Sequence, residues 1–304
     1  MKYRLLFISE DKPDTPEQID GSMRMFAWAL WQQFSKLEHI ELTYHDAKNE
    51  LPHGTWDFVL IHHSDIRTSL FRNLNAVNKL GARQVMWLME CPPHPAHQAD
   101  YCFLWRPVPA GIEGEQIKLP YLRDLCEESL QNVTKVPGSV LLDHVYDITP
   151  RSAENRAWYS DLTSWLKPLH DDGVIRVGQL RRAQHENGWF ELPDWIQSIP
   201  QSNFIEYMKL TAPFETFILT HPGSYEHSIL DMVARGIRVL IPVQNGLVFA
   251  PQVEELKLQT FSTRDELYQL LSESLEADWR KSLCSDIKVV ADRIDTHCRK
   301  LLSI

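Results

Sequence analysis

The residues with the clearest chemical potential lie in the stretch ETFILTHPGSYEHSILDMVARGIRVLIPV, which runs from Glu215 to Val243. His221 and Gly223 stand in a short turn, and Asp231 follows one helical turn into a segment with apolar residues at helical spacing. A glycine lets the backbone approach a ligand closely, and the amide groups at the start of a helix favour an anion. The stretch therefore predicts a phosphate site, with Asp231 able to accept hydrogen bonds from hydroxyl groups.

The elements that must position these residues can be predicted from the same stretch. Thr216–Thr220 and Val239–Val243 are short apolar runs typical of buried parallel strands, and Ser228–Ala234 predicts the helix between them, which Gly236 ends. In open parallel sheets ligands bind beyond the carboxyl ends of the strands. The predicted turn lies at such an end.

This stretch resembles the donor-site signature of two-domain nucleotide-sugar glycosyltransferases of the GT-B fold. In that family a Thr-His-x-Gly turn, a serine, an acid and a glycine lead into the last strands of the second domain. The matching residues here are Thr220, His221, Gly223, Ser228, Asp231, Gly236, Ile237 and Pro242. The sequence departs from the family where Asp231 stands in place of the usual glutamate, and where Gly223 takes the position of a further glutamate, for which only the displaced Glu226 could substitute.

The resemblance implies a role for each donor-side residue. The turn would hold the diphosphate, Asp231 would bond the ribose hydroxyls, and a basic residue after an earlier strand would neutralise charge. The implied donor-binding residues are Arg181, Arg182, His221, Gly223, Ser224, Tyr225, Glu226, Ser228, Asp231 and Asn245. The alternatives are that His221 only caps its strand, that Asp231 is a solvated helix residue, and that the arginine pair is solvated.

Polar residues also collect at strand ends in the first half of the chain. The predicted strand Asp57–His62 ends in His62, His63 and Asp65, and the predicted strand Gln84–Met89 ends in Glu90. These four are the candidates for a general base, should the reaction invert the sugar. The alternative is that one histidine caps the strand and the other is solvated.

The chain opens with a predicted strand, Tyr3–Ser9, and a polar loop that ends at Gly21 and Ser22, where Ser22 suits the N-cap of an amphipathic helix. The resemblance places this loop on the acceptor side. In the second half, the predicted strands Val140–Tyr146 and Val174–Leu180 bring Asp143 and Gln179 to their carboxyl ends.

The predicted fold class is α/β, with two Rossmann-like domains facing each other across a cleft (GT-B). A chain of 304 residues can form two cores, and both halves alternate strands and helices. Pro137-Gly138-Ser139 marks the boundary, which gives an acceptor-side domain of residues 1–136 and a nucleotide-sugar-binding domain of residues 137–304. The resemblance implies that the last helix, predicted over Ala277–Leu302, packs back on the first domain.

Composition narrows the class of function. A net charge of −10 and the lack of a Lys/Arg cluster argue against nucleic-acid binding. The five cysteines contain no CxxC pair, so neither a disulfide framework nor a zinc site is expected. No apolar run has the length of a membrane span, and the first residues do not have the pattern of a signal peptide, so we expect a cytoplasmic protein. The ten tryptophans could include a sugar-stacking platform, although core packing is the more usual role.

The expected function is that of a transferase: a glycosyltransferase that moves a sugar from a nucleoside diphosphate, with UDP expected, to an unidentified acceptor. The nucleotide sugar is a co-substrate, and neither a cofactor nor a metal is expected, because helix amides and basic groups can stabilise the leaving diphosphate. Three alternatives stay open: a nucleotide-sugar epimerase or hydrolase, a non-catalytic nucleotide-binding subunit, and sugar transfer to a nucleic-acid base. The sequence leaves open the donor base and sugar, the acceptor, the stereochemical outcome and the oligomeric state.

Overall fold

The computed structural model describes residues 2–9, 15, 18–19, 22–47, 49–62, 80–89, 99–118, 120–121, 133–143, 152–180, 192–200, 202–220, 226–243, 255–273 and 285–303. The chain forms two compact units. Residues 1–122 and 285–304 make the first unit, and residues 123–284 make the second. No described helix is long and apolar enough to cross a membrane.

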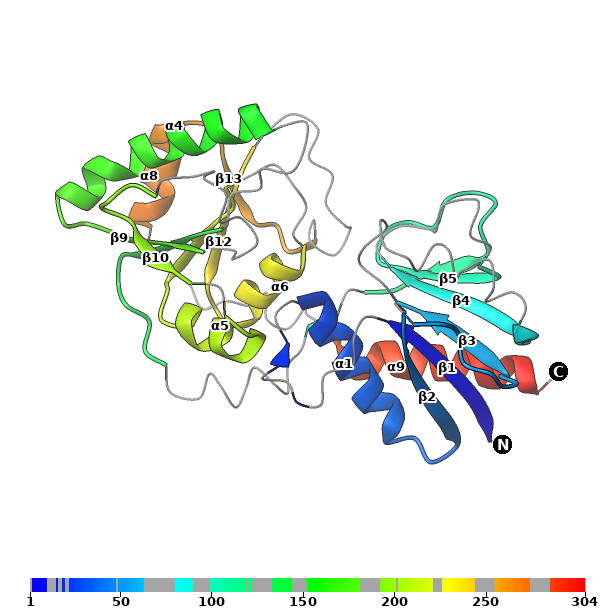
Figure 1. The fold of residues 1–304 in the computed structure, drawn as a ribbon. Helices are drawn as coiled ribbons and strands as arrows, with labels where there is room; N and C mark the ends of the chain where they lie inside the picture. Colours follow the sequence, from blue (N-terminus) through cyan, green and yellow to red (C-terminus); the bar gives the residue numbers. More distant parts are fainter. Residues whose placement is uncertain are drawn as a thin grey trace. The chain divides into compact units, whose positions relative to one another are not determined.

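The first unit is built on a parallel sheet with strand order β2-β1-β3-β4-β5-β6 (Figure 1). Its strands are β1 (Tyr3–Ser9), β2 (Ile40–Asp46), β3 (Phe58–Ile61), β4 (Gln84–Met89), β5 (Tyr101–Leu104) and β6 (Gly114–Gln116). Every residue of β3 is buried, as expected for a parallel strand that is covered on both faces. On one face Leu6 and Ile8 of β1 pack with Trp56 and Trp87 in the main described core of this unit.

The helices α1 (Ser22–Ser35) and α9 (Ile287–Leu302) cover the opposite face of this sheet. Phe34 of α1 packs edge-on against Phe7 of β1. Tyr3 lies four residues before Phe7 and therefore on the same face of β1. Its hydroxyl donates a hydrogen bond to Asp295 of α9 at 2.9 Å. The last helix therefore belongs structurally to the first sheet, although the second unit separates the two in sequence.

The start of α9 differs from the helix predicted over Ala277–Leu302. Ser285–Asp286 is a short strand, β14, which pairs in parallel with β7 (Pro120–Tyr121). Asp286 then caps α9, because its carboxylate accepts from the Lys288 amide at 2.9 Å. Because Ser285–Asp286 pairs with a strand distant in sequence and Asp286 caps the helix, α9 begins at Ile287.

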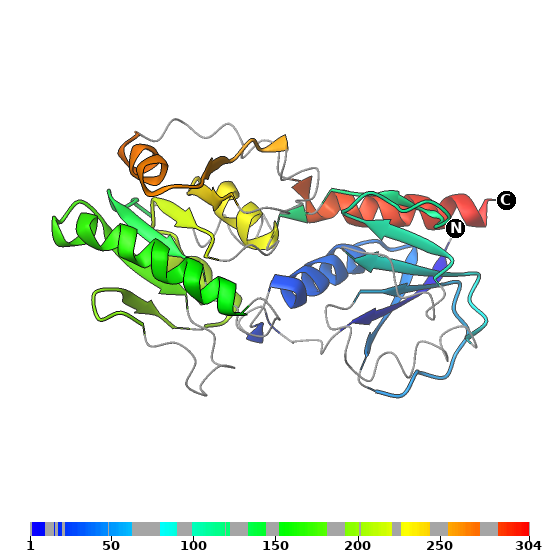
Figure 2. The same ribbon diagram turned by 90° about the horizontal axis from the view of Figure 1, so that it is seen from above.

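The second unit has a six-stranded parallel sheet of its own, with order β10-β9-β8-β11-β12-β13 (Figures 1 and 2). Its strands are β8 (Ser139–Leu142), β9 (Arg176–Leu180), β10 (Gln197–Ile199), β11 (Thr216–Ile218), β12 (Arg238–Pro242) and β13 (Gln259–Phe261). Two parallel α/β sheets with covering helices confirm the predicted Rossmann-like architecture of each half.

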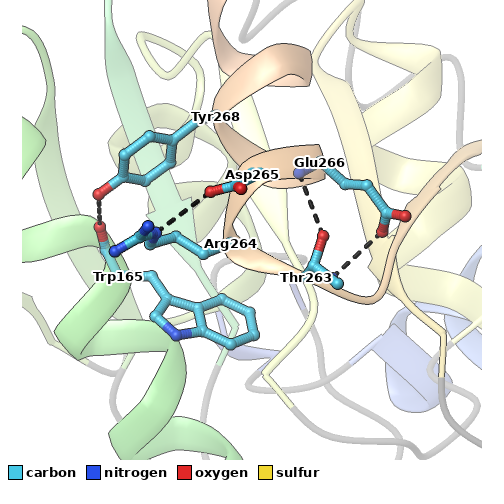
Figure 3. Close-up of polar contacts among 6 residues, drawn as sticks. All are labelled: Trp165, Thr263, Arg264, Asp265, Glu266 and Tyr268. Carbon is cyan, nitrogen blue, oxygen red and sulfur yellow. Dashed lines mark hydrogen bonds and ion pairs between the residues drawn. The ribbon is translucent and has the colours of Figure 1, made fainter.

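Helices α4 (Ser152–Asp171) and α8 (Arg264–Ser272) pack over one face of the second sheet through a core that includes Leu162, Leu166 and Leu267. Figure 3 shows how α8 is fixed: Thr263 and Glu266 form a capping box, and the Tyr268 hydroxyl donates to the Trp165 carbonyl of α4. Helices α5 (Phe204–Thr211) and α6 (Glu226–Ala234) lie on the other side of the sheet in Figure 1.

Strand order fixes where a ligand can bind in each sheet. From β1 the chain continues to β2 on one side, and β3 then pairs with β1 on the other side. The second sheet repeats this arrangement, with β8 between β9 and β11. Such a reversal is a topological switch point, and the crevice at its carboxyl edge is the usual ligand site of an open α/β sheet.

Candidate functional site

Three buried polar residues meet at the switch point of the second sheet. Asp143 follows β8, Thr220 lies two residues beyond β11, and Gln179 is the penultimate residue of β9; each is at most 2% exposed. Thr220 Oγ1 donates to the Asp143 carbonyl oxygen at 3.1 Å, and Gln179 Nε2 donates to the same oxygen. The edge of the sheet is therefore polar at the point where the strands diverge.

Asp231 lies in the middle of α6, the helix that follows β11. Its residue exposure is 6%, so it is not the solvated helix residue of the alternative interpretation. Burial raises the pKa of the Asp231 carboxyl to about 7, and the nearby Arg235 guanidinium opposes this rise. Among the described residues, no side chain or backbone amide donates a hydrogen bond to this carboxylate.

Arg235, the residue after α6, fixes this helix to α5. Its guanidinium donates to the Met208 carbonyl oxygen at 3.2 Å and to the Thr211 hydroxyl, both on α5. The guanidinium carbon also lies 5.5 Å from the centre of the Tyr207 ring. Lys135 adds a second cation at the same helix end, where its Nζ donates to the Ala212 carbonyl oxygen at 2.7 Å. The orientation of α6, and with it that of Asp231, is therefore set by buried hydrogen bonds.

The switch point of the first sheet carries a histidine and a serine. His62 directly follows β3, and its Nδ1 lies 3.4 Å from Ser9 Oγ at the end of β1. The His62 ring stacks on Phe26 of α1 at a centroid distance of 4.7 Å. Both His62 and Ser9 are only 1% exposed. The His62 ring and the Ser9 hydroxyl are therefore packed together at the carboxyl ends of β3 and β1.

Most of the predicted site residues lie outside the described residues. This holds for the acceptor-side candidates His63, Asp65, Glu90 and Gly21, and for the donor-side candidates Arg181, Arg182, His221, Gly223, Ser224, Tyr225 and Asn245. The backbone places Ser22 and Glu226 as the first residues of α1 and α6, and Ser228 lies partly buried in the first turns of α6.

Sequence reasoning did not single out Ser9, and it gave Gln179 a position but no role. Ser9 is the last residue of a predicted strand, and this position at the carboxyl edge of the sheet could have marked it as a site residue. Arg235 and Tyr207 gave no such signal, because their contact arises from the packing of α5 against α6. Within the described part of the chain, no three His, Cys, Asp or Glu side chains gather closely enough to hold a metal ion.

No family model and no curated protein sequence matches the chain. Solved structures do match it over nearly its whole length. The glycotransferase of kitacinnamycin aligns with a TM-score of 0.57 at 12% identity, covering 97% of this chain and 99% of that one. UDP-GlcNAc 2-epimerase from Neisseria meningitidis, bound to UDP-GlcNAc, aligns with a TM-score of 0.56 at 10% identity, covering 98% of this chain and 100% of that one. The Anabaena protein HepE in complex with UDP and glucose aligns with a TM-score of 0.53 at 10% identity, and the alignment covers 99% of each chain. At these identities the likeness establishes the fold, and the chain has the two Rossmann-like units of the GT-B fold.

Proposed function

We propose that the second unit binds a nucleoside diphosphate sugar, with UDP as the nucleotide, and that the protein is an enzyme acting on the bond between sugar and diphosphate. The observation that carries this proposal is the buried Asp231 carboxylate, which lacks a donor among the described residues. Burying an ionisable group without partners is costly, and such groups concentrate at functional sites. Two neighbouring ribose hydroxyls would supply two donors to the two carboxylate oxygens.

The position of Asp231 supports the same ligand. Asp231 lies between the start of α6 and Arg235, so a ribose bonded to it would hold the diphosphate toward the start of α6. Helix amides stabilise anions, and they would oppose the charge that develops on the departing diphosphate. His221, Gly223 and the Arg181–Arg182 pair are the further donors that we propose for this charge.

Sugar transfer is the reaction that we propose first, with the acceptor unidentified. The bond from the anomeric carbon to the diphosphate oxygen breaks, a bond to an acceptor oxygen forms, and the acceptor proton passes to a base. Since His62 is buried against Phe26, we assign that base to His63, Asp65 or Glu90, and we assign His62 to positioning the strand end. Electrostatic stabilisation by α6 amides and basic side chains does not require a metal ion, so we expect activity in excess chelator.

Nucleotide-sugar epimerisation or hydrolysis is the second candidate. It is favoured by the similarity to UDP-GlcNAc 2-epimerase, because both reactions begin with the same kind of donor. Incubation with UDP-GlcNAc or UDP-glucose, without an acceptor and with NMR readout, separates the two. A new nucleotide sugar or rapid UDP release would favour epimerase or hydrolase. Turnover only on addition of an acceptor panel would favour transfer, and binding without any turnover would favour a non-catalytic subunit.

The donor proposal itself is tested by thermal shift with UDP, GDP, TDP, ADP and CMP. A ligand that binds only the native state raises the unfolding temperature. We expect UDP to give the largest rise. If none of the five nucleotides changes the unfolding temperature or gives heat in calorimetry, the proposed function is wrong.

A further inference from the structure

Gln179 carries a buried acceptor that the protein does not use. Its side chain is 2% exposed at the carboxyl end of β9, and its Nε2 donates to the carbonyl oxygens of Asp143 and Leu180. The amide oxygen, Oε1, has no donor among the described residues. A buried amide oxygen left without a donor costs free energy, so such a group calls for an explanation.

The orientation of this amide is determined by its neighbours. The Asp143 carbonyl oxygen accepts from both Gln179 Nε2 and Thr220 Oγ1. Exchanging the nitrogen and oxygen of Gln179 would place two oxygens against each other, which excludes the flipped amide. The bonds of Nε2 thus hold Oε1 at the carboxyl edge of the sheet, beside the switch point between β8 and β11.

We infer that Gln179 Oε1 accepts a hydrogen bond from the nucleoside part of the bound nucleotide, and so helps to select the donor. This inference rests on the proposed function. The ligand must offer an N–H or O–H group at this edge. The two ribose hydroxyls are assigned to the Asp231 carboxylate and each donates once, which leaves the imide N–H of a uracil-type base as the donor to Gln179 Oε1. A base without an imide N–H, such as cytosine, would lack this donor.

The test compares the wild type with Gln179→Met, which keeps the length of the side chain and removes the acceptor. Calorimetry measures affinity for UDP, for deoxyuridine diphosphate and for UDP methylated on the imide nitrogen. Loss of one hydrogen bond should weaken UDP binding to Gln179→Met by about 3- to 10-fold. Gln269→Met on α8, an exposed position in the same unit, is the matched control and should bind UDP as the wild type does.

For the methylated analogue, the ratio of its affinity to that of UDP tests the imide contact, because a merely structural role of Gln179 would not change this ratio. The wild type should discriminate against the methylated analogue, and Gln179→Met should lose that discrimination. Discrimination against the deoxy analogue should be the same in both proteins, because the ribose hydroxyls are assigned to Asp231. Gln179→Leu replaces Gln179→Met should the latter not fold.

The inference is overturned if the wild type binds UDP and the Gln179 variants keep its discrimination against the methylated analogue. That result would leave the proposed function intact. Failure of the wild type itself to bind any of the three nucleotides would instead remove the proposed function on which the inference rests.

Discussion

Replacing Asp231 by asparagine should stabilise the second unit at neutral pH and weaken its binding of UDP. The carboxyl has a pKa of about 7 in the folded chain, against 3.8 when it is solvated. Below pH 3.8 it is protonated in both states. Between these two values only the unfolded chain releases the proton, so the free energy of unfolding falls as pH rises. Above about pH 7 both states are ionised and the penalty stays constant.

The magnitude follows from the size of this pKa difference. Three pH units at about 1.4 kcal/mol each give a penalty of as much as about 4 kcal/mol for the ionised carboxylate. Asp231→Asn should therefore match the wild type in stability near about pH 4 and exceed it by up to about 4 kcal/mol near about pH 8. UDP binding should weaken by about 10- to 100-fold, since asparagine offers one acceptor oxygen and no charge.

Urea unfolding of the full chain at several pH values gives the stability difference, and calorimetry gives the affinity for UDP. Asp161→Asn, on the exposed face of α4, is the control and should change neither quantity. If the stability difference between Asp231→Asn and the wild type did not vary with pH, the raised pKa of Asp231 would be refuted. A stabilised variant with unchanged UDP affinity would refute its contact with the ribose.

Three further substitutions test the packing that supports the two sites. Arg235→Met removes the hydrogen bonds from α6 to α5, and should lower the free energy of unfolding by about 2–3 kcal/mol in urea titrations; an unchanged midpoint would contradict the described contact. Asp295→Asn weakens the bond from Tyr3, so α9 should become less protected in hydrogen exchange while UDP affinity stays the same. Gly178→Ala would place a methyl group 2.6 Å from the Phe214 ring, and thermal unfolding should report a loss of about 1–3 kcal/mol.

Local sequence pattern was sufficient for elements whose apolar run is continuous. Tyr3–Ser9 and Gln84–Met89 form strands with the predicted bounds. Pattern is less informative at the start of helix α4, which begins at Ser152, because its first turns carry mainly polar residues and lack the apolar periodicity from which a helix is predicted. Pro168 lies in the last turn of α4.

Tertiary contacts set the features that sequence could not supply. Strand ends predicted that His62 and Gln179 would lie at the carboxyl edge of a sheet, and both do. The burial of His62 against Phe26 depends on how α1 packs over β3, and the raised pKa of Asp231 depends on its burial near Tyr207 of α5. Neither arrangement has a local signature in sequence, because each joins residues from separate elements.

We propose that the second unit holds a nucleoside diphosphate with its ribose on Asp231. A crystal structure of the protein soaked with UDP tests this placement of the nucleotide. Both ribose hydroxyls should lie within hydrogen-bonding distance of the Asp231 carboxylate, and the diphosphate should lie at the start of α6. UDP bound elsewhere on the chain, or bound there with its ribose turned away from Asp231, would contradict it.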